Sequence, residues 1–254
     1  MLCDGADFVL HANDTLVGRR TGDLGRGLAD GVVEVFSAVN AMGQGIATSL
    51  AQLVVDAFGI PIEQVRVVLG DTDRGDGFGS AGSRSLFTGG SAMRTGAERA
   101  IEHGRELAAQ ALEASVHDVQ YQAGRYQVAG TDLGLNLAEL AARQPERQIF
   151  VDSTSAVAGP SWPNGCHICE VELDPQTGAV QVVRYASVND VGRVVNPLIV
   201  RGQLEGGAVQ GLGQALSEAV AYDAASGQLL SGSLMDYALL RALDTPPFQM
   251  TMDE

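Results

Sequence analysis

The chain has 254 residues, 45% of them hydrophobic, which is enough for a buried core in one large domain or two small ones. Its 31 acidic residues against 16 basic ones, all arginine, give a net charge of −15 and argue against nucleic acid or an anionic membrane as the main partner. Three cysteines form no disulfide framework, and neither a signal peptide nor a membrane-spanning apolar run is found. We therefore expect a soluble, cytoplasmic protein.

The spacing of apolar residues predicts the elements of the first part of the chain. Residues 1–30 are polar and rich in glycine, and we expect them to be irregular. After them we predict a strand at 32–39, a helix at 43–58, a strand at 65–69, a glycine-rich loop at 70–82, a helix from about 90 to 115, and a small strand pair with a short helix at 119–149. Residues 31–152 are thus predicted to form one subdomain.

A loose segment at 153–165, with two prolines, is expected to link this subdomain to a second one at 166–254. Two strands, 167–173 and 179–188, flank the turn sequence Asp174-Pro175-Gln176-Thr177-Gly178. Asn196-Pro197 predicts the start of a third long helix, with asparagine as its cap. The stripe of this helix predicted to be buried comprises Leu204, Ala208, Gly211, Leu212, Ala215, Leu216 and Ala219. This order of elements predicts an α+β fold.

Two glycine motifs are candidates for phosphate binding. Gly43-Gln44-Gly45 lies between a predicted strand and a predicted helix, where free backbone N–H groups favour an anion; a plain tight turn is the alternative. Gly77-Phe78-Gly79-Ser80-Ala81-Gly82 matches the dinucleotide fingerprint G-x-G-x-x-G, but seven residues separate it from the preceding strand and no helix opens within it. We therefore reject a Rossmann site, and the absence of lysine excludes a Walker A loop.

The residues around that loop suggest an anion rather than a cation. Asp71, Asp73 and Asp76 lack the glycine and glutamate of a calcium loop, so we interpret them as solvated carboxylates. Ser83-Arg84-Ser85 precedes Thr88-Gly89-Gly90, which we take as a helix start. Two hydroxyl groups, an arginine and backbone amides suit an anion with several oxygens. A helix cap with a surface arginine remains the alternative.

Cys166-His167-Ile168-Cys169 could suggest zinc, but the segment is predicted to be a strand, in which the two thiols point to opposite faces. No second cysteine pair completes a tetrahedral site. We expect Cys166 and Cys169 to be buried structural thiols. The helix after Asn196 has five glycines between 202 and 213, each costing on the order of 1 kcal/mol relative to alanine, so we expect close packing or a large ligand near Gln203.

Taken together, these segments resemble the large subunits of molybdenum hydroxylases, the family of xanthine dehydrogenase, aldehyde oxidase and carbon monoxide dehydrogenase. The resemblance covers roughly residues 30–248. Its motifs are Met42-Gly43-Gln44-Gly45, Gly70-Asp71-Thr72, Ala81-Gly82-Ser83-Arg84-Ser85, Pro163-Asn164-Gly165-Cys166-His167, Asp190-Val191-Gly192-Arg193, Asn196-Pro197, Gly202-Gln203, Gln210-Gly211-Leu212-Gly213-Gln214-Ala215 and Asp236-Tyr237-Ala238.

The resemblance implies an α+β molybdopterin-binding domain with mixed sheets and long glycine-rich helices. It also implies that the cofactor's dithiolene sulfurs hold the molybdenum, so that no side chain of this chain is a metal ligand. In bacterial members the cofactor is usually molybdopterin cytosine dinucleotide. Carried over by position, Gln44, between Gly43 and Gly45, lies near the molybdenum and pterin. Phosphate and pterin polar groups fall to Gly82, Ser83, Arg84 and Ser85, and a pterin hydrogen bond to Gln203.

The implied activity is hydroxylation of an aldehyde or N-heterocycle with oxygen from water, with electrons passing to 2Fe-2S and FAD partner subunits. The family's catalytic glutamate lies in a segment beyond Glu254, so we expect the isolated chain to be inactive and to require the rest of a large subunit or a second molybdopterin subunit. The alternatives are a non-catalytic module for cofactor holding or assembly, and a nucleotide-binding protein without metal.

Overall fold

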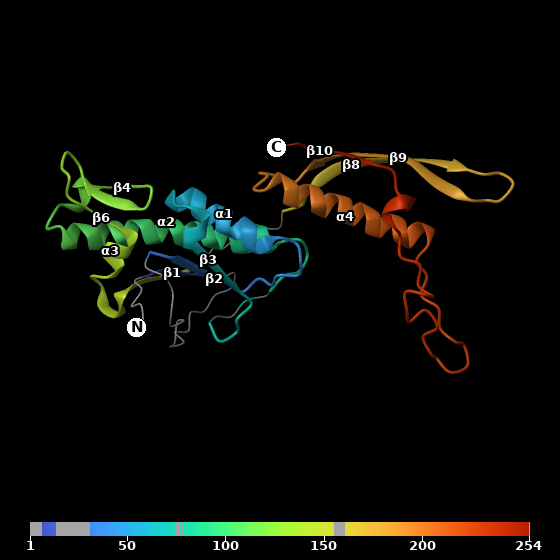
Figure 1. Cartoon of the computed structure of the whole chain (residues 1–254), viewed down its shortest axis with the longest axis horizontal. Helices are drawn as coiled ribbons and strands as arrows, with labels where there is room; N and C mark the ends of the chain where they lie inside the picture. The colour runs from blue at the N-terminus through green and yellow to red at the C-terminus, as the bar shows by residue number, and fades with distance from the viewer. Residues whose placement is uncertain (1–6, 14–30, 75–76, 78, 155–160, 254) are drawn as a thin grey trace. The chain divides into compact units, whose positions relative to one another are not determined.

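The computed structural model describes residues 7–13, 31–74, 77, 79–154 and 161–253, which fall into two compact units, Met1–Pro160 and Ser161–Glu254 (Figure 1). Both helices and sheets are present in each unit, so the predicted α+β class is confirmed. In the described part of the chain, none of the helices is both long and apolar enough to cross a membrane.

The first unit is built on a parallel four-stranded sheet with the order β3-β2-β1-β7. Its larger elements are β1 (Asp7–Asn13), β2 (Val33–Ser37), α1 (Ile46–Phe58), β3 (Val65–Leu69), α2 (Ser85–Ala111) and β7 (Gln148–Thr154). Helices α1 and α2 lie side by side and pack on the sheet (Figure 1). The core between them contains Val33 and Val35 of β2, Leu50 and Phe58 of α1, and Met93 of α2. Parallel sheets are normally covered on both faces, and all five residues of β2 are buried.

Strand β1 corrects the expectation that residues 1–30 are irregular. It occupies a central place in the sheet, pairing Phe8 with Val33 on one side and with Ile149 on the other. The sequence Asp7–Asn13 has no clear alternation of apolar and polar residues, because a central parallel strand needs none.

A small antiparallel sheet completes the first unit. It consists of β4 (Val119–Gln122), β5 (Arg125–Val128) and β6 (Gly134–Asn136), followed by α3 (Leu137–Ala141). Asn136 and Glu139 form a capping box at the start of α3. Short 3-10 turns lie at Ile62–Gln64, Val116–Asp118 and Pro145–Arg147 in this unit, and at Ala242–Asp244 in the other. The predicted strand pair with a short helix is therefore confirmed, with one further strand.

The second unit contains a three-stranded sheet, in the order β10-β9-β8, and one long helix. Its elements are β8 (Asn164–Leu173), β9 (Val180–Asp190), α4 (Pro197–Leu216) and β10 (Phe248–Asp253). The predicted turn joins β8 to β9: the Asp174 carboxylate accepts hydrogen bonds from the Gln176 N–H at 2.8 Å and the Thr177 hydroxyl at 2.7 Å, and Gly178 has a φ of 75°. Asn196 caps α4 as predicted, accepting from the Ile199 N–H at 3.0 Å.

Burial in the second unit differs from expectation. Of the α4 residues only Gly213 is buried, so the predicted buried stripe is wrong for the described chain. Cys166 and Cys169 lie on β8 as free thiols, but both are exposed rather than buried. Apolar periodicity marks a face suited to burial but does not supply the surface that covers it. The described residues leave every residue of β8 exposed and bury only Gly213 of α4.

Candidate cofactor-binding site

The loop between β2 and α1 carries Gly43-Gln44-Gly45. Gly43 has a φ of 89° and Gly45 a φ of 76°, both in the left-handed region that residues with a Cβ avoid. Gly45 is the N-cap of α1, and no side chain caps this helix start. The backbone N–H groups of the first turn therefore carry the positive end of the helix dipole without a side-chain acceptor. Local geometry of this kind favours an anion.

The Gln44 side chain folds back onto its own loop. Its Nε2 donates to the Asn40 carbonyl at 2.8 Å, and its Oε1 accepts from the Met42 N–H at 2.6 Å. An amide NH₂ group has two hydrogens, so one remains for another acceptor after the bond to Asn40. Gln44 thus holds the shape of the loop and keeps one donor.

Asn40 joins this loop to the second one, which follows β3. The Asn40 N–H donates to the Ser80 hydroxyl oxygen at 2.8 Å, and that hydroxyl group lies 3.0 Å from the Asn40 carbonyl. The same carbonyl accepts from Gln44, so two loops 40 residues apart in sequence meet at one peptide group. Neither Asn40 nor Ser80 was predicted to belong to the site. Asn40 takes part through its backbone N–H and carbonyl, which leave no residue-type signal in a sequence.

The second loop ends at the start of α2. This helix begins at Ser85, so the prediction that it starts at Thr88-Gly89-Gly90 is wrong by about one turn. Gly82 and Ser83 precede it with φ angles of 60° and 56°, and Arg84 is the N-cap, again without a side-chain capping bond. A left-handed serine is strained by about 1–3 kcal/mol, and such strain is concentrated at ligand sites.

The early start of α2 has a packing cause. Gly89 and Gly90 are buried inside the helix, and a Cβ on Gly89 would stand 3.0 Å from the Val39 side chain. The absence of that Cβ lets the first turns of α2 lie against the end of β2. Consequently Ser83, Arg84 and Ser85 lie directly at the N-terminus of α2 rather than in a loop several residues ahead of it.

Gln203 belongs to the second unit, where it is exposed on α4. A Cβ added at Gly202, Gly206, Gly207 or Gly211 would meet no described atom within 4 Å outside the adjacent residues and backbone of its own helix. The expected close packing of these glycines is therefore not made by the described residues. The structure brings the predicted residues of the first unit to two neighbouring loops, and it places Gln203 in the other unit.

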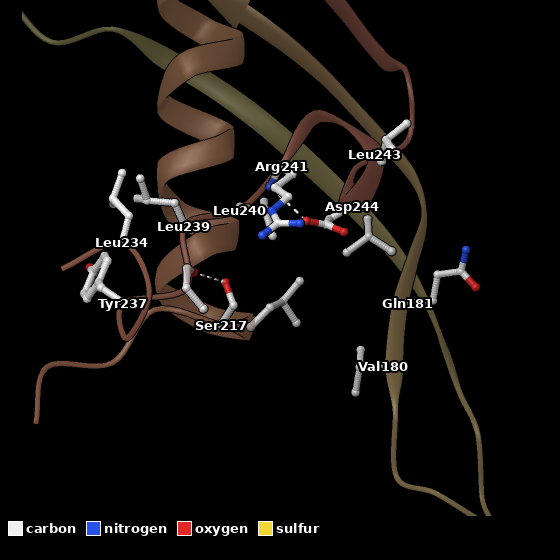
Figure 2. A pocket seen from close by; sticks show the side chains of 13 residues that line it. Val180, Gln181, Ser217, Leu234, Tyr237, Leu239, Leu240, Arg241, Leu243 and Asp244 are labelled. Atoms are coloured by element: carbon white, nitrogen blue, oxygen red, sulfur yellow. Dashed lines mark hydrogen bonds between the residues drawn. The ribbon is translucent and has the colours of Figure 1, made fainter. Parts of the chain in front are cut away.

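The second unit also contains a cavity of about 760 Å³ between the start of β9, the end of α4 and residues 234–244 (Figure 2). Leu216, Leu239 and Leu243 line it together with polar residues such as Arg241 and Asp244. The backbone N–H of Arg241 donates to the Asp244 carboxylate at 2.8 Å. Tyr237 donates to Glu218 at 2.6 Å, and this bond, ahead of desolvation, raises the pKa of Tyr237. None of the predicted site residues lines this cavity.

The two loop–helix junctions of the first unit fit a ligand rich in anionic oxygens. Neither α1 nor α2 has an acidic residue in its first turn, in a protein whose net charge is −15. The donors at the α2 junction are backbone N–H groups, the hydroxyls of Ser83 and Ser85, and the half-buried Arg84 guanidinium. Such a donor set matches phosphate and pterin carbonyl oxygens. Among the described residues, no three His, Cys, Asp or Glu side chains gather as metal ligands would.

Comparison with known proteins agrees with this geometry. A family model described as the molybdopterin cofactor-binding domain matches residues 24–246. The chain is 38% identical over 226 residues to the 6-hydroxypseudooxynicotine dehydrogenase complex subunit gamma of Paenarthrobacter nicotinovorans, covering 85% of this chain and 28% of that protein. It is 34% identical to the nicotine 6-hydroxylase large subunit of the same organism, covering 98% of this chain and 31% of that protein. The chain thus spans less than a third of the length of these relatives.

A solved structure of CO dehydrogenase from Oligotropha carboxidovorans superposes with a TM-score of 0.71 at 28% identity, covering 85% of this chain and 28% of that one. Quinoline 2-oxidoreductase from Pseudomonas putida 86 gives a TM-score of 0.71 at 33% identity, covering 87% of this chain and 29% of that one. The family resemblance and the molybdopterin-binding fold expected from the sequence are confirmed. The chain belongs to the family of molybdopterin cofactor-binding domains found in the large subunits of molybdenum hydroxylases.

Proposed function

We propose that this chain supplies the molybdopterin-binding part of a molybdenum hydroxylase and binds the cofactor in its cytosine dinucleotide form. The residues assigned to it are Gly43, Gln44, Gly45, Gly82, Ser83, Arg84, Ser85 and Gln203. The observation that carries the proposal is the junction at Asn40. It joins the two loops that lead into helix starts without side-chain caps or acidic residues in the first turn.

Each assigned group has a distinct task. The remaining Gln44 amide hydrogen is a donor to an oxygen near the pterin and molybdenum. Ser83, Arg84 and Ser85 bind the pyrophosphate, because an arginine fork and a helix start both favour anionic oxygens. Gln203 donates to the pterin from α4. When bound, the molybdopterin cofactor would supply the two-electron oxidation of a substrate with oxygen derived from water. No residue of this chain is assigned as the catalytic base.

The substrate class is an N-heterocycle or an aldehyde. Two of the relatives described above carry nicotine and quinoline in their names, and both are N-heterocycles. Electrons would pass to iron–sulfur and FAD subunits, since three cysteines cannot hold such clusters. The composition supports a cytoplasmic location, as argued from the sequence.

The second unit supports a protein partner, either the rest of a large subunit or a second molybdopterin subunit. Its exposed apolar side chains include Trp162 at 77%, Met235 at 93% and Leu243 at 97% exposure. Monomeric proteins rarely expose many large apolar side chains in one region, and such surfaces mark interfaces.

The test is Arg84→Ala in the complex assembled from the full chain and its partner subunits. Losing a contact between arginine and an anionic ligand costs about 1.5–3 kcal/mol, which is at least tenfold in affinity. We expect molybdenum and pterin content to fall while the midpoint of thermal unfolding stays near that of the parent.

The matched control is Arg94→Ala, on the same helix. Arg94 is 68% exposed and pairs with Glu98 at 3.0 Å, a surface ion pair worth about 0–1 kcal/mol. Cofactor content should be unchanged in this variant. Equal molybdenum content in the Arg84→Ala variant and the parent, at equal stability, would show that Arg84 does not bind the cofactor.

A further inference from the structure

A buried carboxylate lies in the middle of β2. Val33 and Val35 belong to the core against the helices, so the side chain of Glu34, between them, points to the opposite face of the sheet. That side chain is only 2% exposed. Burying an ionised carboxylate is costly unless it is paired. Glu34 therefore requires partners, and the structure supplies two arginines.

The closer partner is Arg74, 40 residues along the chain in the loop that follows β3. Arg74 Nη1 lies 2.6 Å from Glu34 Oε1, and Arg66 Nη1 lies 3.5 Å from the other carboxylate oxygen. Arg66 faces Glu34 across the β2–β3 pair and is half exposed, whereas the Arg74 side chain is 16% exposed. The short, buried contact is thus the one made by the loop.

Arg74 is held from its own side as well. Its Nε lies 3.1 Å from Asp71 Oδ2, and its backbone N–H donates to the Asp71 carbonyl at 3.1 Å, closing a turn. The Asp71 side chain also accepts from the Asp73 N–H at 3.1 Å. From the sequence we expected Asp71 to be a solvated carboxylate, but it also forms an ion pair with Arg74. With Glu34 and Asp71 both paired to it, the Arg74 charge is neutralised within the protein.

The loop is attached to one short segment at three points. Gly70 donates to the Ser37 carbonyl at 3.1 Å, Arg74 binds Glu34, and Ser80 bonds to Asn40. The three anchors Glu34, Ser37 and Asn40 are three residues apart along β2 and its continuation. Of these contacts only the Glu34–Arg74 pair is made between two side chains.

We propose that Glu34 is a positioning residue for the cofactor: by holding Arg74 it fixes the first part of the loop whose last residues, Ser83, Arg84 and Ser85, lie at the start of α2. The inference rests on the proposed function for its purpose but not for its geometry. It also separates the roles of two nearby arginines, with Arg84 facing the anionic ligand and Arg74 fixing the loop. Glu34 touches neither cofactor nor substrate in this role.

The test uses amide hydrogen exchange of the peptide spanning residues 70–84 in the full chain, together with molybdenum and pterin content in the assembled complex. Glu34→Gln keeps the size of the side chain and removes its charge. We expect exchange in this peptide to rise at least tenfold and cofactor content to fall. The control is Glu98→Gln, which breaks an ion pair whose two side chains are both more than 60% exposed and should change neither reading.

The double variant Glu34→Gln with Arg74→Met distinguishes positioning from stability. It removes both buried charges and leaves only Arg66 and Asp71, whose side chains are 47% and 39% exposed. Replacing both members of a buried pair is often neutral for stability. We expect its unfolding midpoint to return toward that of the parent while exchange stays fast and cofactor content stays low. Recovery of exchange protection and cofactor content along with stability would overturn the proposal.

The two proposals can fail separately. If the parent complex contains no molybdopterin, the proposed function fails, and the exchange measurement still decides whether Glu34 holds the loop. If the parent contains the cofactor and Glu34→Gln leaves both exchange and content unchanged, the positioning role is wrong and the proposed function stands.

Discussion

At the scale of single residues, the site depends on backbone conformations that few residue types adopt. Gly43 and Gly45 have left-handed φ angles, and Gly45 is also the N-cap of α1. Left-handed geometry is what directs the chain sharply from β2 into the helix and leaves its N–H groups facing outward. Ser83 adopts the same left-handed conformation before α2, although this conformation is strained for a serine.

This predicts the effect of Gly45→Ala. An L-residue with a side chain in the left-handed region costs about 1–2 kcal/mol, so the free energy of unfolding should fall by that amount. Denaturant unfolding followed by circular dichroism measures it. Gly207→Ala is the control of opposite sign: Gly207 lies inside α4 with open space around it, so alanine should stabilise that helix by up to about 1 kcal/mol. Equal effects at both sites would contradict the conformational argument.

At the scale of elements, two tyrosines fix the small antiparallel sheet to the helices. Tyr121 donates to the carbonyl of Phe58 at the end of α1, at 2.8 Å, and Tyr126 donates to the carbonyl of Ile101 in α2, at 3.1 Å. The ring centroids of the two tyrosines are 4.8 Å apart. Burial raises the pKa of both phenols well above the usual value near 10. The sheet is therefore docked by neutral hydroxyl groups.

The raised pKa values predict alkaline destabilisation. Because the folded pKa lies above the unfolded value, the stabilising contribution is complete below pH 10 and is lost as the pH rises beyond it. Between pH 10 and 12 the free energy of unfolding should fall by up to about 1.4 kcal/mol per pH unit for Tyr126. Tyr126→Phe should make this fall shallower, as read by unfolding experiments at several pH values. An equally steep fall in the variant would show that Tyr126 does not titrate with unfolding.

At the scale of the whole molecule, the two units differ in how completely they bury their apolar residues. The first has a continuous core, from Val33 to Ile149. In the second, Val182 is the one buried apolar side chain of the described residues, and α4 buries only Gly213. So small a core is in accord with the protein partner proposed above, because association would bury further apolar surface.

The thiols of β8 provide a measurement of that association. Cys166 and Cys169 are exposed, so in a Cys3→Ser background of the isolated chain both should react with a thiol reagent about as fast as in the unfolded chain. Assembly with the partner subunits should slow at least one of them tenfold or more. Equal rates in the isolated chain and the complex would mean that both faces of β8 stay open at these thiols and that the partner binds elsewhere.

The features that the sequence determined by itself are local ones. The turn at Asp174–Gly178, the Asn196 cap and the start of α1 after Gly45 are each closed by hydrogen bonds or dihedral angles within a few residues. Residue type is therefore sufficient to predict them. The motifs around Gln44 and Arg84 pointed to the family for the same reason, since they are short and specific in spacing.

Tertiary structure alone decided the rest, because it depends on contacts between distant segments. β1 became a central strand by pairing with β2 and β7. The start of α2 moved to Ser85, where Gly89 lets the helix approach Val39. Two loops contact each other through the backbone N–H and carbonyl of Asn40, and Glu34 in β2 pairs with Arg74, 40 residues away. Periodicity identified the apolar face of α4, but it could not say what covers that face, since burial is a property of the partner surface as well.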